Sequence, residues 1–181
     1  MSEELEVLKR VARRHDGLGI PYMVTGWMAV NYYAVPRTTR DIDIVVELGT
    51  GDADRLCEAF QDDFYVDREA VRRAVEEQGL FNLIHGASVV KVDFVVRKES
   101  EYRRVEFSRR RRIRVEDHEL SAVAPEDLII SKLDWARETR SEVQLADVRN
   151  LLACVPGLDD AYLAQWTDRL GLDSMYREVR G

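Results

Sequence analysis

The apolar positions of the N-terminal segment predict two helices with a strand between them. Residues 3–15 predict an amphipathic helix that packs on a sheet, because its apolar members recur at helical spacing: Val7, Leu8, Val11 and Ala12. His15 is expected at the C-terminal end of this helix, where it suits the helix dipole. Residues 20–24 predict a short buried strand, and residues 27–34 are an apolar segment of helical length.

A second strand is predicted after this helix, and it begins with two carboxylates. In residues 41–46, Asp41 and Asp43 alternate with Ile42 and Ile44. Side chains two positions apart on a strand share a face, so both aspartates look at the same volume while the isoleucines occupy the other face.

The rest of the chain predicts a hairpin and several helices. The apolar runs 81–85 and 88–96 predict a hairpin closed at Gly86, and Asp93 lies in the middle of the second run. Helices are expected in four further places, where apolar positions recur between capping or breaking residues: residues 53–60, residues 68–78, the segment opened by Pro125, and the last third of the chain over 143–153 and 159–170.

Two aspartates on one strand face need a compensating cation. At a separation of about 6 Å and an effective dielectric constant of about 20, their repulsion is roughly 3 kcal/mol. Arg37 and Arg40 precede the strand and could neutralise an exposed strand end. A divalent metal is the other candidate, because Mg²⁺ prefers oxygen ligands and is commonly held by one or two carboxylates together with substrate phosphates.

Two further features bear on this choice. Gly26 lies at the turn from strand to helix, and unpaired amides at a helix N-terminus bind anions such as phosphate, although a lone glycine marks many turns without a ligand. Asp93 would be costly as a buried unpaired charge, so it needs a cation or donors nearby; Lys91 shares its face at spacing two. The alternative is an aspartate that faces solvent on an amphipathic strand.

These residues resemble a known superfamily. Thr25-Gly26-Trp27, followed by the pattern Pro-Arg-x-Thr-x-Asp-x-Asp over 36–43, is similar to the nucleotidyltransferases of the polymerase-β type. Within it, the chain looks most like the AbiEii-like and related small bacterial nucleotidyltransferase-like proteins, several of which are toxins of toxin–antitoxin or phage-defence systems. The similarity extends through residues 91–96, 121–133 and 144–148.

The resemblance implies a metal site and a nucleotide site. Mg²⁺, or Mn²⁺, would be held by three carboxylates that are also the catalytic residues: Asp41, Asp43 and Asp93. A nucleoside triphosphate would be bound by residues around the glycine turn, the arginines before the strand and a lysine after Pro125-Glu126-Asp127-Leu128: Thr25, Gly26, Trp27, Arg37, Arg40 and Lys132. The acceptor implied is RNA, protein or a small molecule, and a cognate antitoxin is the implied protein partner. Asp147 is a further site residue by analogy, with a solvent-facing helical aspartate as the alternative.

Trp27 departs from the family pattern. The superfamily has glycine or serine at this position, which leaves room for the triphosphate on the backbone. An indole would block the triphosphate, stack on its base, or serve as a core residue of the short helix. The alternative to an enzyme is therefore a catalytically inactive member of the fold that binds a nucleotide or a partner.

Composition and charge restrict the partners. The net charge is −7, which argues against wholesale polyanion binding, yet residues 97–114 hold nine Lys or Arg against three Glu. That run is either a local polynucleotide contact or a solvated charged helix. The two cysteines, Cys57 and Cys154, have no metal-ligand spacing. No apolar run approaches the length of a membrane span, and a cytoplasmic protein without a membrane partner is expected.

Taken together, the sequence predicts an α/β (α+β) fold. A small mixed, twisted sheet of the nucleotidyltransferase type is flanked by helices over residues 1–120. Residues 121–181 form a helical part packed on that core, or the two together form one single domain. The function expected is Mg²⁺-dependent transfer of a nucleoside monophosphate from a nucleoside triphosphate.

Overall fold

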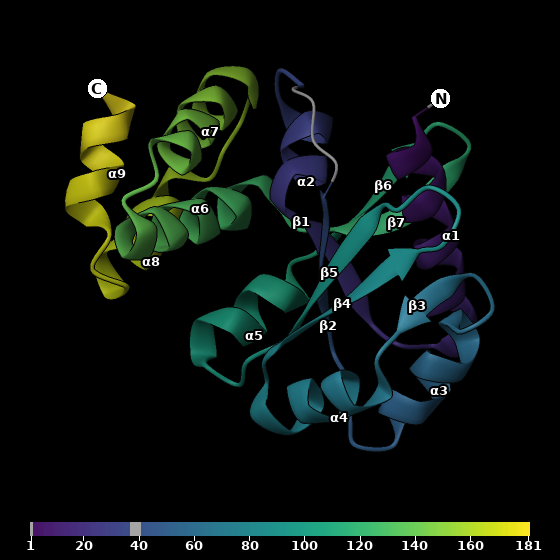
Figure 1. The fold of residues 1–181 in the computed structure, drawn as a ribbon. Helices are drawn as coiled ribbons and strands as arrows, with labels where there is room; N and C mark the ends of the chain where they lie inside the picture. Colours follow the sequence, from purple (N-terminus) through teal and green to yellow (C-terminus); the bar gives the residue numbers. More distant parts are fainter. Residues whose placement is uncertain (1, 37–40) are drawn as a thin grey trace.

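A mixed sheet of seven strands is the centre of the computed structural model, which describes residues 2–36 and 41–181 (Figure 1). The strands are β1 (Tyr22–Thr25), β2 (Asp41–Val46), β3 (Phe64–Val66), β4 (Leu80–His85), β5 (Lys91–Val96), β6 (Arg111–Val115) and β7 (His118–Ala122). Their order across the sheet is β3-β4-β5-β2-β1-β7-β6. The pairs β2–β5 and β1–β7 are parallel, and the other neighbours are antiparallel.

Helices cover both faces of this sheet. Those in the described residues are α1 (Glu3–Leu18), α2 (Gly26–Tyr33), α3 (Asp52–Phe60), α4 (Arg68–Glu77), α5 (Glu101–Ser108), α6 (Pro125–Thr139), α7 (Glu142–Cys154), α8 (Asp160–Arg169) and α9 (Asp173–Arg180). Several begin at a side-chain cap: the Ser2 hydroxyl accepts from the Leu5 amide, and the Asp67 carboxylate accepts from the amides of Glu69 and Ala70. Pro125 occupies the first turn of α6, where a missing N–H costs nothing.

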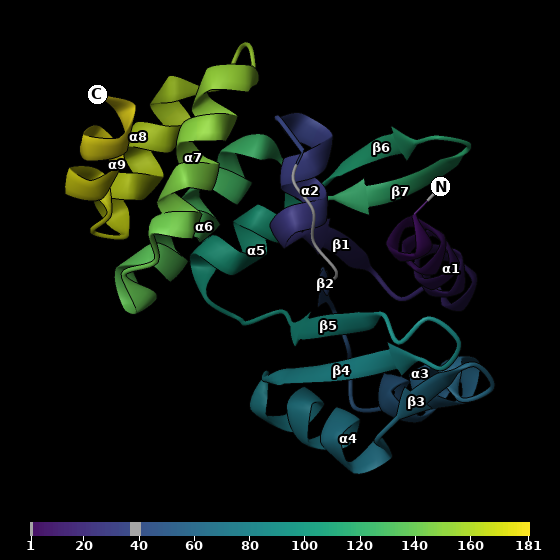
Figure 2. The same ribbon diagram turned by 45° about the horizontal axis from the view of Figure 1, so that its top comes forward.

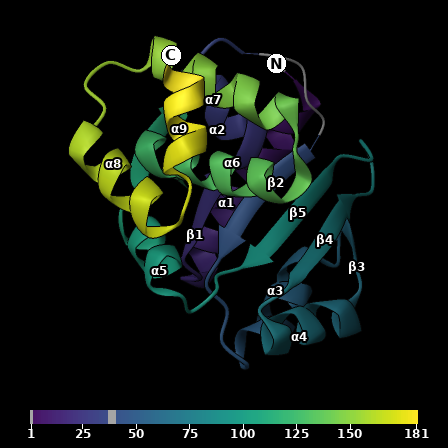
Figure 3. The ribbon, with the colours of Figure 1, turned by 90° about the vertical axis from the view of Figure 1, so that its left-hand side faces the viewer.

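Strand alternation divides the core into two hydrophobic clusters. Ile42, Ile44 and Val46 are fully buried on the face that α1, α3 and α4 cover. The second cluster lies on the opposite face and joins Met23 of β1 to α2, α5 and the C-terminal helices. Figures 1 and 3 show α6 to α9 gathered on the side of α2 and α5, away from α3 and α4. Asp41 and Asp43 project to this second side, next to the helices.

The α/β fold class predicted from the sequence is confirmed, as is the antiparallel pairing of β4 with β5. The division at residue 120 stays a prediction, and β7 runs across it. In the described segments, 2–36 and 41–181, the structure contains no helix long and apolar enough to cross a membrane.

Three expectations need correction or addition. The basic run over 97–114 is not one charged helix, because it contains α5 and then the edge strand β6. The elements β3, β7 and α9 were not predicted. His15 lies in the last turn of α1, as predicted, but the helix continues to Leu18 and the imidazole is fully buried against the rings of Tyr22, Phe60 and Phe94.

Candidate functional site

A row of polar side chains crosses four neighbouring strands at one level of the sheet. Thr25 of β1 lies opposite Asp43 of β2, Asp43 lies opposite Asp93 of β5, and Asp93 lies opposite Asn82 of β4. Residues paired in this way on adjacent strands project to the same face, with backbones about 4.8 Å apart. The parallel pairing of β2 with β5 thus brings together two carboxylates that are fifty positions apart in the sequence. Figure 2 shows β4 and β5 side by side, with α3 and α4 below them in the view.

The adjacent level of the sheet adds a third carboxylate and an ammonium group. Asp41 lies opposite Lys91. The Lys91 Nζ is 2.8 Å from Oδ2 of Asp93, two residues further along the same strand. This ion pair raises the pKa of Lys91, chiefly through the hydrogen bond to Asp93 and further through the charges of Asp41 and Asp43. Lys91 therefore lies on the same face as Asp93, as its spacing suggested. We call the face that carries Asp41, Asp43 and Asp93 the acidic face.

Asp43 has a pKa raised above its ordinary value. Burial raises its pKa, and the neighbouring charge of Asp93 raises it further. The positive charge of Lys132 lowers the pKa of Asp43 and so partly offsets these effects. A half-buried carboxylate beside a like charge is in the environment that a bound cation relieves.

Gly26 makes close contact with Asp43 at the turn from β1 into α2. Its φ is +59°, a conformation that glycine adopts without strain. A Cβ built at this position would lie 2.0 Å from Oδ2 of Asp43. The absence of a side chain is thus required twice, once by the backbone conformation and once by the carboxylate that lies against it.

The helices form the wall that faces the acidic strands. Lys132 of α6 is buried, and its Nζ lies 2.8 Å from Asp147 Oδ2 and 2.9 Å from Gln144 Oε1, both on α7. The same Nζ is 5.0 Å from the centre of the Trp27 ring, a cation–π contact. Trp27 is only partly buried, and it connects the start of α2 to α6.

The donor set matches part of a Mg²⁺ site. Among residues 2–36 and 41–181, no three His, Cys, Asp or Glu side chains are gathered so that they could hold a metal ion. Asp93 is turned onto Lys91, and Asp43 lies against Gly26. Proteins, however, usually bind Mg²⁺ through one or two carboxylates plus substrate phosphates, not through a cage made only of protein. The hard oxygen donors, and the raised pKa of Asp43 among them, therefore fit a cation that arrives with a triphosphate.

The structure brings together those candidate site residues from the sequence analysis that lie in its described part. Thr25, Gly26, Trp27 and Lys132 lie around the row that contains Asp43 and Asp93, with Asp41 one level away. Arg37 and Arg40 fall outside the described residues.

Sequence reasoning missed two further residues, Asn82 and Gln144. Asn82 could not be found from the sequence, because its place beside Asp93 depends on strand register. Gln144 had one signal, its position three residues before Asp147.

Several arginines of the basic run over residues 97–114 form ion pairs with carboxylates of the same chain. Arg109 Nε donates to Asp127 Oδ2 at 2.9 Å, Arg111 pairs with Glu126, and Arg97 pairs with Glu47 and Glu99. Arg103 binds both Glu106 and Asp134. A polyanion would have to compete with these intramolecular partners.

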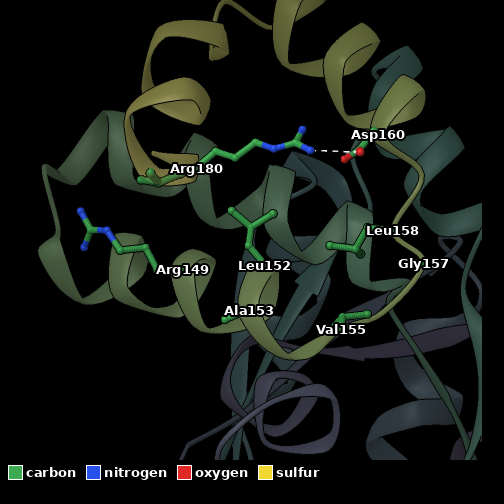
Figure 4. A pocket seen from close by; sticks show the side chains of 9 residues that line it. Arg149, Leu152, Ala153, Val155, Gly157, Leu158, Asp160 and Arg180 are labelled. Carbon is green, nitrogen blue, oxygen red and sulfur yellow. Dashed lines mark hydrogen bonds and ion pairs between the residues drawn. The ribbon is translucent and has the colours of Figure 1, made fainter.

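A cavity lies apart from the acidic face, among the C-terminal helices. It measures about 500 Å³ and is lined by residues of α7, α8 and α9 and of the connection between α7 and α8 (Figure 4). Arg180 and Asp160 form an ion pair across it at 3.0 Å. None of the acidic-face residues contributes to its lining.

The fold is that of the nucleotidyltransferases. An antigenic nucleotidyltransferase-like protein from Paracoccidioides brasiliensis matches with a TM-score of 0.59 at 20% identity, over 97% of this chain and 93% of that one. The lincosamide antibiotic adenylyltransferase LnuA, with lincomycin bound, gives 0.55 at 12% identity, over 83% and 96% of the two chains. ANT(2″)-Ia in complex with adenylyl-2″-tobramycin gives 0.50 at 14% identity, over the whole of both.

No family model and no curated protein sequence matches the chain. The structural similarity establishes the shared fold. At identities this low, the activity has to be argued from the site.

Proposed function

We propose that this protein is a Mg²⁺-dependent nucleotidyltransferase, with Mn²⁺ as an alternative metal, that transfers a nucleoside monophosphate from a nucleoside triphosphate to an acceptor hydroxyl. The observation that carries the proposal is the facing pair Asp43 and Asp93, with the side-chain-free turn at Gly26 directly against Asp43. The structural similarity to LnuA and ANT(2″)-Ia, which are described with antibiotic substrates or adenylyl products, supports it.

The chain's own residues have separable tasks in this reaction. Amides at the start of α2, beyond Gly26, would bind the triphosphate, because the first N–H groups of a helix lack intrahelical partners. Asp41, Asp43 and Asp93 would hold the metal, and Lys132 would place positive charge near the phosphates. A divalent cation bound there would supply charge neutralisation and lower the pKa of the acceptor hydroxyl.

The bond changes are those of a single displacement. The acceptor oxygen forms a bond to the α-phosphorus, and the bond from that phosphorus to the bridging oxygen breaks, so that pyrophosphate leaves with the electron pair. Asp93 lies between Asp43 and Asn82 in the polar row, and we assign it as the carboxylate that accepts the hydroxyl proton. The acceptor, whether RNA, protein or small molecule, and a role in a cytoplasmic toxin–antitoxin or phage-defence system remain parts of this proposal.

The double variant Asp41→Asn with Asp43→Asn tests the site. Calorimetric titration with Mg²⁺ and each nucleoside triphosphate should show binding to the wild type and none to the variant. The matched control is Asp62→Asn with Asp168→Asn, which makes the same charge change at exposed positions. Equal triphosphate affinity in the wild type and the folded double variant would contradict the proposal. Incubation with α-labelled triphosphates and RNA, protein or small-molecule acceptors then identifies the product.

A second candidate is a catalytically inactive protein of the same fold that binds a nucleotide or a partner. The contact between Trp27 and Lys132 favours it, because the lysine is already engaged by the indole, Asp147 and Gln144. The variant Trp27→Ser distinguishes the possible roles of the indole in triphosphate binding. Tighter triphosphate binding would mean that the indole blocks the phosphates. Weaker binding, by about 5- to 150-fold, would mean that it stacks on the base. Equal affinity in two well-folded proteins would exclude both ligand roles for Trp27.

A further inference from the structure

Lys91 occupies an unusual position for a lysine on a strand. It lies on the acidic face, opposite Asp41 and next to the pair formed by Asp43 and Asp93. Its Nζ is 2.8 Å from Asp93 Oδ2, while the lysine side chain remains 43% exposed and the aspartate side chain only 16%. The ammonium group can therefore leave the carboxylate for solvent or for a ligand without rearrangement of the backbone.

An ammonium group and a divalent cation compete for the same carboxylate oxygen. The Lys91 ammonium is a compact point charge with three donors on a flexible stem, and it is attracted by all three aspartates. As long as it holds Asp93, that oxygen is not available as a metal ligand. This agrees with the absence, in the described part of the chain, of a three-carboxylate cluster that could hold a metal by itself.

We propose that Lys91 is a positioning residue that acts as a built-in counter-ion: it holds Asp93 in the ligand-free protein and moves to the triphosphate when the metal–triphosphate complex binds. The inference rests on the proposed function, because it concerns the same site. Free metal must displace the ammonium group and leave it unpaired, whereas the complex offers phosphate oxygens as new partners. Lys91 thereby makes the site select the metal–triphosphate complex over the free metal.

The test measures metal and nucleotide affinity separately in Lys91→Met. Mn²⁺ binding without nucleotide, followed by electron paramagnetic resonance, should be at least tenfold tighter than in the wild type. Binding of a non-hydrolysable ATP analogue with saturating Mg²⁺ should be at least threefold weaker, because the phosphate partner is lost. Lys98→Met is the matched control, since Lys98 is an exposed lysine beyond the end of the same strand. It should change neither affinity.

The inference predicts that Lys91→Met binds Mn²⁺ more tightly and the ATP analogue more weakly. A lysine with a merely structural role would not change the two affinities in opposite directions. Unchanged or weaker Mn²⁺ affinity in Lys91→Met overturns the inference, as does a Lys91→Arg variant that binds Mn²⁺ as tightly as Lys91→Met, because arginine keeps the competing charge. Lys91→Gln serves as a second neutral variant if the methionine variant does not fold, and the same outcomes apply to it.

Asp43→Asn distinguishes failure of this inference from failure of the proposed function. If it loses Mn²⁺ binding while Lys91→Met gains none, only the counter-ion inference fails. If neither the wild type nor any variant binds Mn²⁺, with or without the analogue, the metal site and the proposed function fail together.

Discussion

Two groups of carboxylates in the described part of the chain differ in their surroundings. The first is the acidic face described above. The second, the arginine-bound cluster, lies between α5, α6 and α8 and comprises Glu106, Glu126 and Asp127. In that cluster Asp127 accepts from Arg109 Nε at 2.9 Å and from the Tyr162 hydroxyl at 2.6 Å. Glu106 accepts from Arg103 at 3.0 Å and from the Ser131 hydroxyl.

The two groups differ in what offsets the cost of burying a carboxylate. In the arginine-bound cluster, burial raises the pKa of Asp127 and of Glu106, but fixed donors bind the charged forms and offset that cost. On the acidic face, the second-largest influence on the pKa of Asp43 is another carboxylate, Asp93. The carboxylates of the arginine-bound cluster are held by fixed donors, whereas Asp43 is buried beside a like charge, which is the environment the proposed function assigns to a cation.

The largest effect expected from this comparison is on stability. Asp127→Ala should lower the free energy of unfolding by about 3 kcal/mol, at the low end for a broken buried pair because Arg109 is partly exposed. Urea unfolding gives the value, with Asp62→Ala as the exposed control. Triphosphate affinity of the folded variant should not change. A loss below 1 kcal/mol would show that the donors around Asp127 contribute little to the fold.

His15 supplies a third case, an imidazole buried among aromatic rings. Burial lowers its pKa from 6.5 to about 4. Between these two values the unfolded chain binds a proton that the native protein does not, so stability should fall as the pH drops from about 6.5 to about 4. The total loss is about 3 kcal/mol. Urea midpoints measured from pH 7 to pH 4 should show this slope in the wild type and not in His15→Leu. Identical slopes in both proteins would assign the pH dependence to other groups.

The smallest effect is expected on the acidic face itself. Asp43→Asn in the absence of metal should leave the free energy of unfolding unchanged or raise it by less than about 1 kcal/mol, because the variant removes a repulsion and no ion pair. Urea unfolding in the presence of a chelator measures it. If Asp43→Asn instead destabilised the protein as much as Asp127→Ala, the distinction between the two groups of carboxylates would be wrong.

Strand alternation predicted the local geometry, whereas the nearness of Asp93 to Asp41 and Asp43 was predicted only through the family resemblance. The shared face of Asp41 and Asp43 follows from the alternation of one strand. That Asp93 stands opposite Asp43 depends on the register between β2 and β5, which the intervening α3, β3, α4 and β4 decide.

Two other misses have physical reasons. The strand β6 was missed because four consecutive arginines, Arg109 to Arg112, conceal it, although an edge strand tolerates such charges. The burial of His15 was missed because the sequence shows only its place near the end of α1, whereas the burial of its ring depends on tertiary packing.

The contact between Gly26 and Asp43 has a consequence for how the protein can evolve. A methyl group at position 26 collides with the carboxylate at position 43, so the fitness effect of a change at one position depends on the residue at the other. The same Cβ would also lie 2.8 Å from the Cβ of Asp43, so a shorter side chain at 43 does not by itself make room for alanine at 26. Gly26 is therefore expected to persist in descendants even where Asp43 has been replaced.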